Sequence, residues 1–113
     1  MDKNFFFNFK ENIPAKHDNE IFETILSNEN IKMERIISYG QTTPKDQWYD
    51  QDEDEFVFLI SGEAKIKYDD DSIYHLKSGM SLYITAHQKH QVIYTSNPTI
   101  WLTLFVKGSK DDK

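Results

Sequence analysis

The sequence predicts an all-β fold, a sandwich or barrel of many short strands, from two observations. Short runs of apolar and β-branched residues recur along the chain, and polar turns separate them at intervals of about ten residues, as in sandwiches and barrels. In one run, Glu63–Tyr68, apolar and charged residues alternate with the period of a half-buried strand. The 113 residues fit one domain with one core.

The first two strands are expected to form a hairpin after an irregular N-terminal arm, residues 1–20. Ile21–Ser27 and Ile31–Ser38 flank the polar turn Asn28–Asn30. A helix over Asn19–Leu26 is the competing interpretation, because that segment contains good helix formers. Its β-branched residues and the turn that follows favour a strand.

Six further strands are expected beyond the loop 40–47. They are Glu55–Ile60, Glu63–Tyr68, Ile73–Leu76, Ser81–Thr85, Gln91–Thr95 and Thr99–Val106. Residues 21–106 therefore make one barrel domain. Residues 107–113 are expected to be a disordered tail, because they contain no apolar side chain whose burial could offset the entropy of ordering them.

Composition excludes several classes of partner. The net charge of −6 argues against nucleic acid and anionic lipid. No apolar run is long enough to span a membrane, so no membrane partner is expected. The absence of cysteine excludes disulfides and thiolate metal sites. We expect a cytoplasmic protein.

Two segments hold the candidate functional residues. Five of the six residues from Asp50 to Glu55 are acids, and they lead directly into the apolar run Phe56–Ile60, which is expected to be buried on both faces. Some of these carboxylates must enter the interior, where a carboxylate needs an ion pair, hydrogen bonds or a bound cation. The second segment contains two histidines three residues apart, His87 and His90.

These segments resemble the two motifs of the cupins, small double-sheet jelly rolls. Gly40 can open the first motif, and Glu55 precedes Gly62 by the spacing of the family. Tyr49 and Gln51 occupy the places where the family has two metal-binding histidines.

In the second motif Gly79 takes the first place, and Thr85 stands where proline is usual. His87 takes the turn position and His90 the ligand position. The resemblance covers Ile31 to Val106. It implies an all-β, double-stranded β-helix (jelly-roll) barrel, with pairing of two copies and a metal site as features of the family.

Strand geometry supports a shared pocket. Tyr49, Gln51 and Glu55 have the same parity, so on an extended strand they point to one side. His90 shares a face with Val92 and Tyr94 by the same argument.

Tyr49, Gln51, Glu55 and His90 are therefore expected to line one pocket inside the barrel. Carboxylate, amide oxygen and imidazole suit a divalent cation such as Zn, Mn, Fe or Ni, and His87 could add a further ligand.

Arg35 is a candidate partner for Glu55. It shares parity with Met33 and Ile37 and is expected to point inward, where it could neutralise the carboxylate or bind a ligand together with Tyr49.

Two functions follow from these residues. The first is a small cupin whose barrel binds a divalent metal and a small polar metabolite, as an enzyme or a sensor. The alternative is a metal-free module that binds or senses a small molecule. The sequence leaves open whether a reaction is catalysed, because no nucleophile and base stand at a recognisable spacing.

A homodimer is also expected. The N-terminal arm carries more apolar surface than an unstructured segment should expose, in Phe5, Phe6, Phe7, Phe9 and Ile13. Open strand edges also favour pairing with a second copy.

Overall fold

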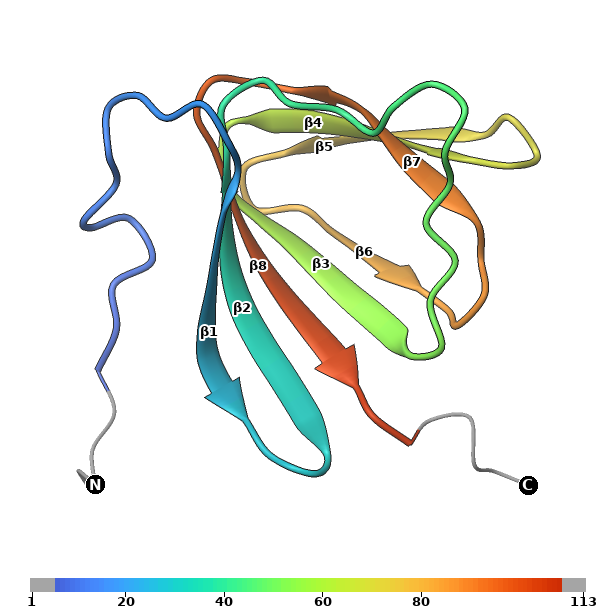
Figure 1. Ribbon diagram of the computed structural model, residues 1–113, viewed down its shortest axis with the longest axis horizontal. Coiled ribbons are helices and arrows are strands. Elements are labelled where there is room, and N and C mark those ends of the chain that lie inside the picture. Colours follow the sequence, from blue (N-terminus) through green and yellow to red (C-terminus); the bar gives the residue numbers. More distant parts are fainter. Residues whose placement is uncertain (1–5, 109–113) are drawn as a thin grey trace.

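The computed structural model describes residues 6–108, which form eight strands in two facing sheets (Figure 1). The strands are β1 (Ile21–Ser27), β2 (Ile31–Ser38), β3 (Asp54–Ser61), β4 (Glu63–Tyr68), β5 (Ile73–Lys77), β6 (Ser81–Ile84), β7 (His90–Thr95) and β8 (Thr99–Val106). The all-β prediction and all eight expected strands are confirmed, with differences of one residue at some ends. The helix considered for residues 19–26 is absent, since β1 occupies that segment.

All neighbouring strands pair antiparallel. The larger sheet has the order β1-β2-β8-β3-β6, and the smaller one, β5-β4-β7, lies across it (Figure 1). Apolar side chains from both inner faces form the core: Val57, Leu59, Ala64, Ile66, Leu76, Ile84 and Trp101.

The two sheets are joined at a corner built around Gly62, the single residue between β3 and β4. Its φ of +98° favours glycine, and a Cβ there would meet the Ser96 hydroxyl and lie 2.9 Å from the carbonyl oxygen of Pro98. Ser96 belongs to the connection from β7 to β8. Its hydroxyl accepts a hydrogen bond from the Glu63 amide at 3.0 Å, and its own amide donates to the Glu63 carbonyl at 2.9 Å. Two crossings between the sheets are thus tied together at one point.

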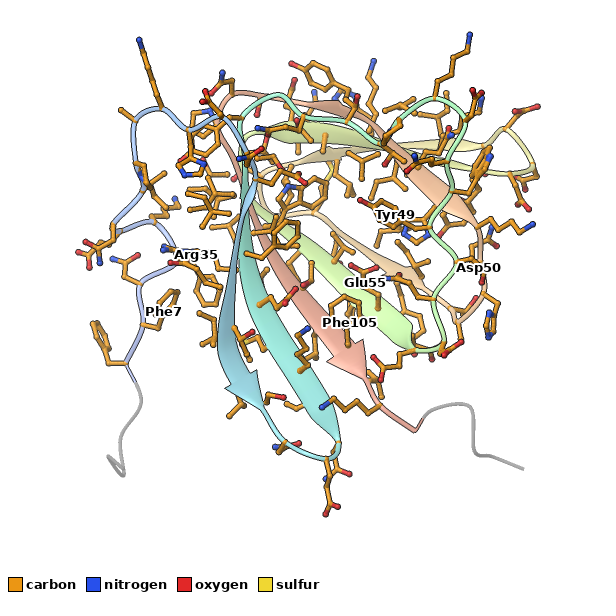
Figure 2. The ribbon with its side chains drawn as sticks, viewed as in Figure 1. Phe7, Arg35, Tyr49, Asp50, Glu55 and Phe105 are labelled. Atoms are coloured by element: carbon orange, nitrogen blue, oxygen red, sulfur yellow. The ribbon has the colours of Figure 1, made fainter. Side chains whose placement is uncertain are left out.

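The N-terminal segment packs against the outer face of the larger sheet around Arg35. This side chain is buried and donates to Glu23 Oε1 at 2.5 Å, to the carbonyl oxygen of Glu11 at 2.6 Å and to that of Phe9 at 3.3 Å. The Phe7 ring lies 5.0 Å from the guanidinium carbon. Figure 2 shows Arg35 and Phe7 on the side of β2 away from the space between the sheets. The prediction that Arg35 points inward is therefore wrong.

Strand β3 is buried on one face, not on both as expected. Val57 and Leu59 face the core, whereas Phe56 and Phe58 are half-buried on the outer face with their rings stacked at 4.5 Å. The apolar run reflects an outer sheet face that is itself largely apolar.

The homodimer expected from the sequence stays a prediction.

Lys107, the first residue of the predicted tail, is hydrogen-bonded to the first hairpin. The Lys107 amide donates to the carbonyl oxygen of Asn30 at 2.8 Å, and its ammonium donates to that of Asn28 at 2.8 Å. The predicted disordered tail thus begins with a residue that makes specific contacts, and residues 109–113 lie outside the described part. Residues 6–108 contain no helix long and apolar enough to cross a membrane.

Replacing Gly62 by alanine should destabilise the protein more than the same change at Gly79. Both glycines have positive φ, so each substitution should cost about 1–3 kcal/mol of backbone strain. Only Gly62 is enclosed, because nothing lies within 4 Å of a Cβ at Gly79. Overpacking should add about 1–3 kcal/mol at Gly62. Denaturant unfolding of both variants measures the difference, and equal losses would show that the corner is not tightly packed.

Candidate functional site

The inner faces of the two sheets enclose a cavity of about 130 Å³. Polar side chains from several elements line it: Glu20, Glu34, Tyr49, Gln51, Glu55, His90 and Thr103. The remaining lining is apolar, with the aromatic side chains Phe22, Trp101 and Phe105 on the larger sheet. Among residues 6–108, no lysine or arginine lines this cavity. The space therefore combines an apolar wall with acidic and amide groups.

Glu55 and His90 face each other in this cavity from opposite sheets. Their exposed fractions are 8% and 4%, and Glu55 Oε1 lies 3.8 Å from His90 Nε2. That separation is too long for a direct hydrogen bond. His90 Nδ1 lies 2.8 Å from the carbonyl oxygen of Gln88, which can only accept, so the bond assigns the ring proton to Nδ1. The unprotonated Nε2 thus points at Glu55.

Tyr49 and Gln51 lie at the edge of the cavity, on the segment that leads into β3. The backbones of Tyr49 and His90 exchange two hydrogen bonds, of 2.8 and 3.1 Å, and their rings lie 5.4 Å apart. Figure 2 shows Tyr49 above Glu55 and Phe105, with Asp50 directed away. Tyr49, Gln51, Glu55 and His90 line one space, as predicted, and the binding of a ligand there stays a prediction.

Two other predicted site residues lie elsewhere. His87 does not line the cavity: it is 60% exposed, with Nδ1 2.7 Å from Asp50 Oδ1 and Nε2 3.5 Å from Asp52 Oδ1. Its φ of +65° turns the chain at this point, so its side chain does not follow the direction of His90. Arg35 lies on the outer face and pairs with Glu23, so it does not neutralise Glu55.

His90, Val92 and Tyr94 were expected to share one face of β7, and only the first two do. Val92 lies opposite Ile66 and faces inward, but Tyr94 lies opposite Lys65, whose ammonium is 5.9 Å from the Tyr94 ring on the outer side. The register shifts by one residue between these pairs. Such a bulge reverses the side on which later residues point, and parity alone could not reveal it.

Glu34 and Thr103 are cavity residues that the sequence interpretation missed. They are register partners on β2 and β8, and Thr103 is in turn the partner of Val57 on β3. Thr103 is 2% exposed, and its hydroxyl has no hydrogen-bond partner within residues 6–108. For Glu34 the sequence signal is its even parity on β2. The odd face of β2, which the N-terminal segment covers, is more apolar and therefore favours the opposite orientation.

Burial changes the proton affinity of both central groups. Desolvation, followed by the negative charge of Glu34, raises the pKa of Glu55 to about 7. Desolvation lowers the pKa of His90, although its bond to the Gln88 carbonyl acts in the opposite direction. At neutral pH His90 is therefore uncharged, and Glu55 lies near the midpoint of its titration.

The donor set falls short of a tightly held metal. Glu55 and His90 are the two strong donors that face each other in the cavity, and Gln51 and Tyr49 are weak ones. Metal sites of the catalytic type use three protein ligands. Among the described residues, no group of three or more histidine, aspartate or glutamate side chains could hold an ion. These residues do not fit a resident divalent metal.

Comparison with known proteins agrees with this architecture. A model of the family described as Cupin domain matches residues 34–105. A solved structure from Ralstonia eutropha JMP134, whose name proposes a mannose-6-phosphate isomerase, is 35% identical. The match covers 91% of this chain and 98% of that one, with a TM-score of 0.87.

More distant structures share the fold. A cupin superfamily protein from Desulfitobacterium hafniense DCB-2 is 17% identical over 84% of each chain, with a TM-score of 0.72. A conserved protein with a double-stranded β-helix domain from Klebsiella pneumoniae is 18% identical over 95% of this chain and 93% of that one, with a TM-score of 0.75. No curated protein matches the chain. The jelly-roll fold inferred from the two motifs is confirmed.

Replacing Glu55 by glutamine should stabilise the protein at alkaline pH. Unfolded Glu55 releases its proton near 4.5, whereas the folded protein retains it up to about 7. Stability should therefore fall as pH rises between these values, by about 3 kcal/mol in total. The charged or titratable groups that face Glu55 are Glu34, His90 and Tyr68.

The advantage of Glu55→Gln should be largest near pH 8 and vanish near pH 4, as measured by denaturant unfolding across this range. Glu29→Gln, at an exposed carboxylate in the β1–β2 turn, is the matched control and should behave like the wild type. A constant difference at all pH values would contradict the raised pKa.

Proposed function

The chain belongs to the cupin domain family, and from this premise we propose that its cavity binds a small polar organic molecule without a resident metal. The observation that carries the proposal is the pair formed by Glu55 and His90. Their facing atoms lie 3.8 Å apart, buried and without a direct bond between them. Buried polar groups normally have hydrogen-bond partners. A ligand polar group in the cavity that contacts both atoms would supply them.

The binding mode follows from the groups that face the cavity. His90 Nε2 accepts a hydrogen bond, and Glu55 accepts one when ionised or donates one when protonated. Val57, Ile66 and Val92 offer an apolar wall to the carbon skeleton of the ligand. Such a site binds and orients a ligand, which is what a sensing or binding module requires.

A phosphorylated sugar is a second candidate, suggested by the name of the Ralstonia protein and its 35% identity to this chain. A phosphate group is usually bound by arginine, lysine or a cluster of backbone amides. The lining of this cavity offers acids in place of such cations. This lining therefore favours a ligand without a phosphate group.

A divalent cation held by Glu55, His90 and Gln51 is the version that the donor set argues against, although His90 Nε2 and Glu55 Oε1 face the same space. Elemental analysis of protein purified without a histidine tag separates the two versions. We expect no stoichiometric Zn, Mn, Fe or Ni, since only two strong donors converge.

His90→Ala and His87→Ala are the matched variants for this measurement. Both remove an imidazole, but only His90 faces the cavity. One equivalent of metal that is lost in His90→Ala and kept in His87→Ala would overturn the metal-free version and support the alternative.

A further inference from the structure

We propose that the cavity selects a small organic cation, whose ammonium group lies between Glu34 and Glu55 and donates a hydrogen bond to the Thr103 hydroxyl. This inference rests on the proposed binding function and adds the charge class of the ligand.

The charge of the lining is the first argument. Three carboxylates line the cavity, from Glu20, Glu34 and Glu55, while His90 is neutral and no lysine or arginine is present in the lining. An anionic ligand would add a further negative charge to an apolar space and find no cationic partner. A cation would instead relieve the repulsion between Glu34 and Glu55.

The Thr103 hydroxyl is the second argument and is independent of the carboxylates. Thr103 stands between Glu34 and Val57 in the register of the larger sheet. Thr103 lines the cavity, and its buried hydroxyl oxygen has no hydrogen-bond partner within residues 6–108. An unsatisfied buried hydroxyl is costly, and an N–H donor of the ligand would satisfy it.

Lys32, a cation of the protein itself, shows the preference of this region. The ammonium of Lys32 lies 3.1 Å from Glu34 Oε2 and 5.8 Å from the centre of the Phe105 ring, while its side chain stays 39% exposed. A cation thus already sits against an acid and an aromatic ring beside the cavity. Trp101 adds a buried aromatic ring to the lining and Phe22 an exposed one, and cation–π attraction to such rings favours the same charge.

The cavity volume limits the size of the enclosed part of the ligand. A buried cavity of about 150 Å³ holds one benzene molecule. The cavity of about 130 Å³ should therefore enclose a group of about six non-hydrogen atoms, such as a six-membered ring.

An NMR titration with three probes tests the inference. Piperidine carries a positive charge at neutral pH, tetrahydropyran has the same ring without the charge, and mannose 6-phosphate represents an anion. Piperidine should bind about tenfold more tightly than tetrahydropyran, the effect of one charge-assisted hydrogen bond. The backbone amide signals of Glu34, Glu55 and Thr103 should shift.

Two charge variants sharpen the test. Glu34→Gln should reduce piperidine affinity about tenfold and change tetrahydropyran affinity much less, and shifts of the cavity signals with tetrahydropyran report that the cavity is intact. Lys32→Gln should increase piperidine affinity, because it removes the cation that competes for Glu34. Glu29→Gln, an exposed carboxylate of the same type, should change neither affinity.

The outcomes separate the two proposals. Equal affinities for piperidine and tetrahydropyran, or tighter binding of mannose 6-phosphate at the cavity signals, would overturn the selection of a cation while the binding function stands. If none of the probes shifted a cavity signal, the binding function itself would fail, and the inference with it.

Discussion

The corner at Gly62 is the constraint on which the rest of the barrel depends. One residue carries the chain from β3 in the larger sheet to β4 in the smaller one. The next residue, Glu63, exchanges two hydrogen bonds with Ser96 in the return crossing from β7 to β8. The turn from β5 to β6 also closes at this end, where the Gly79 amide donates to the carbonyl oxygen of Leu59 at 2.8 Å. Three crossings between the sheets are thus held together, and the inner faces are fixed relative to each other.

The position of the polar cavity follows from that arrangement. Glu55 stands near the start of β3 and His90 at the start of β7, so both lie at the strand ends away from the corner. Leu59 and Ala64 flank the corner in sequence and fill the core near it. The barrel therefore has an apolar end that stabilises it and a polar end that a ligand can reach. Burial at this end raises the pKa of Glu55, so ionisation of that carboxylate opposes folding.

Much of this architecture could be predicted from the sequence, because alternation and turn residues are local signals. The spacing of the two motifs also predicted that Glu55 and His90 share one cavity. Three features could not be predicted because they depend on contacts far away in the chain. Arg35 faces outward because the N-terminal segment covers that face of β2. Tyr94 points away from the cavity because of a bulge in β7. Thr103 lines the cavity through its register with β2 and β3.

The central claim is that the cavity presents an unprotonated imidazole nitrogen opposite a carboxylate, ready to bind a polar group. The tautomer of His90, read from the ¹⁵N chemical shifts of its ring by NMR at neutral pH, tests this most directly. The account predicts a neutral ring with its proton on Nδ1, bonded to the Gln88 carbonyl, and a bare Nε2. A proton on Nε2, or a charged imidazolium at neutral pH, would contradict it, because the acceptor assigned to the ligand would then not exist.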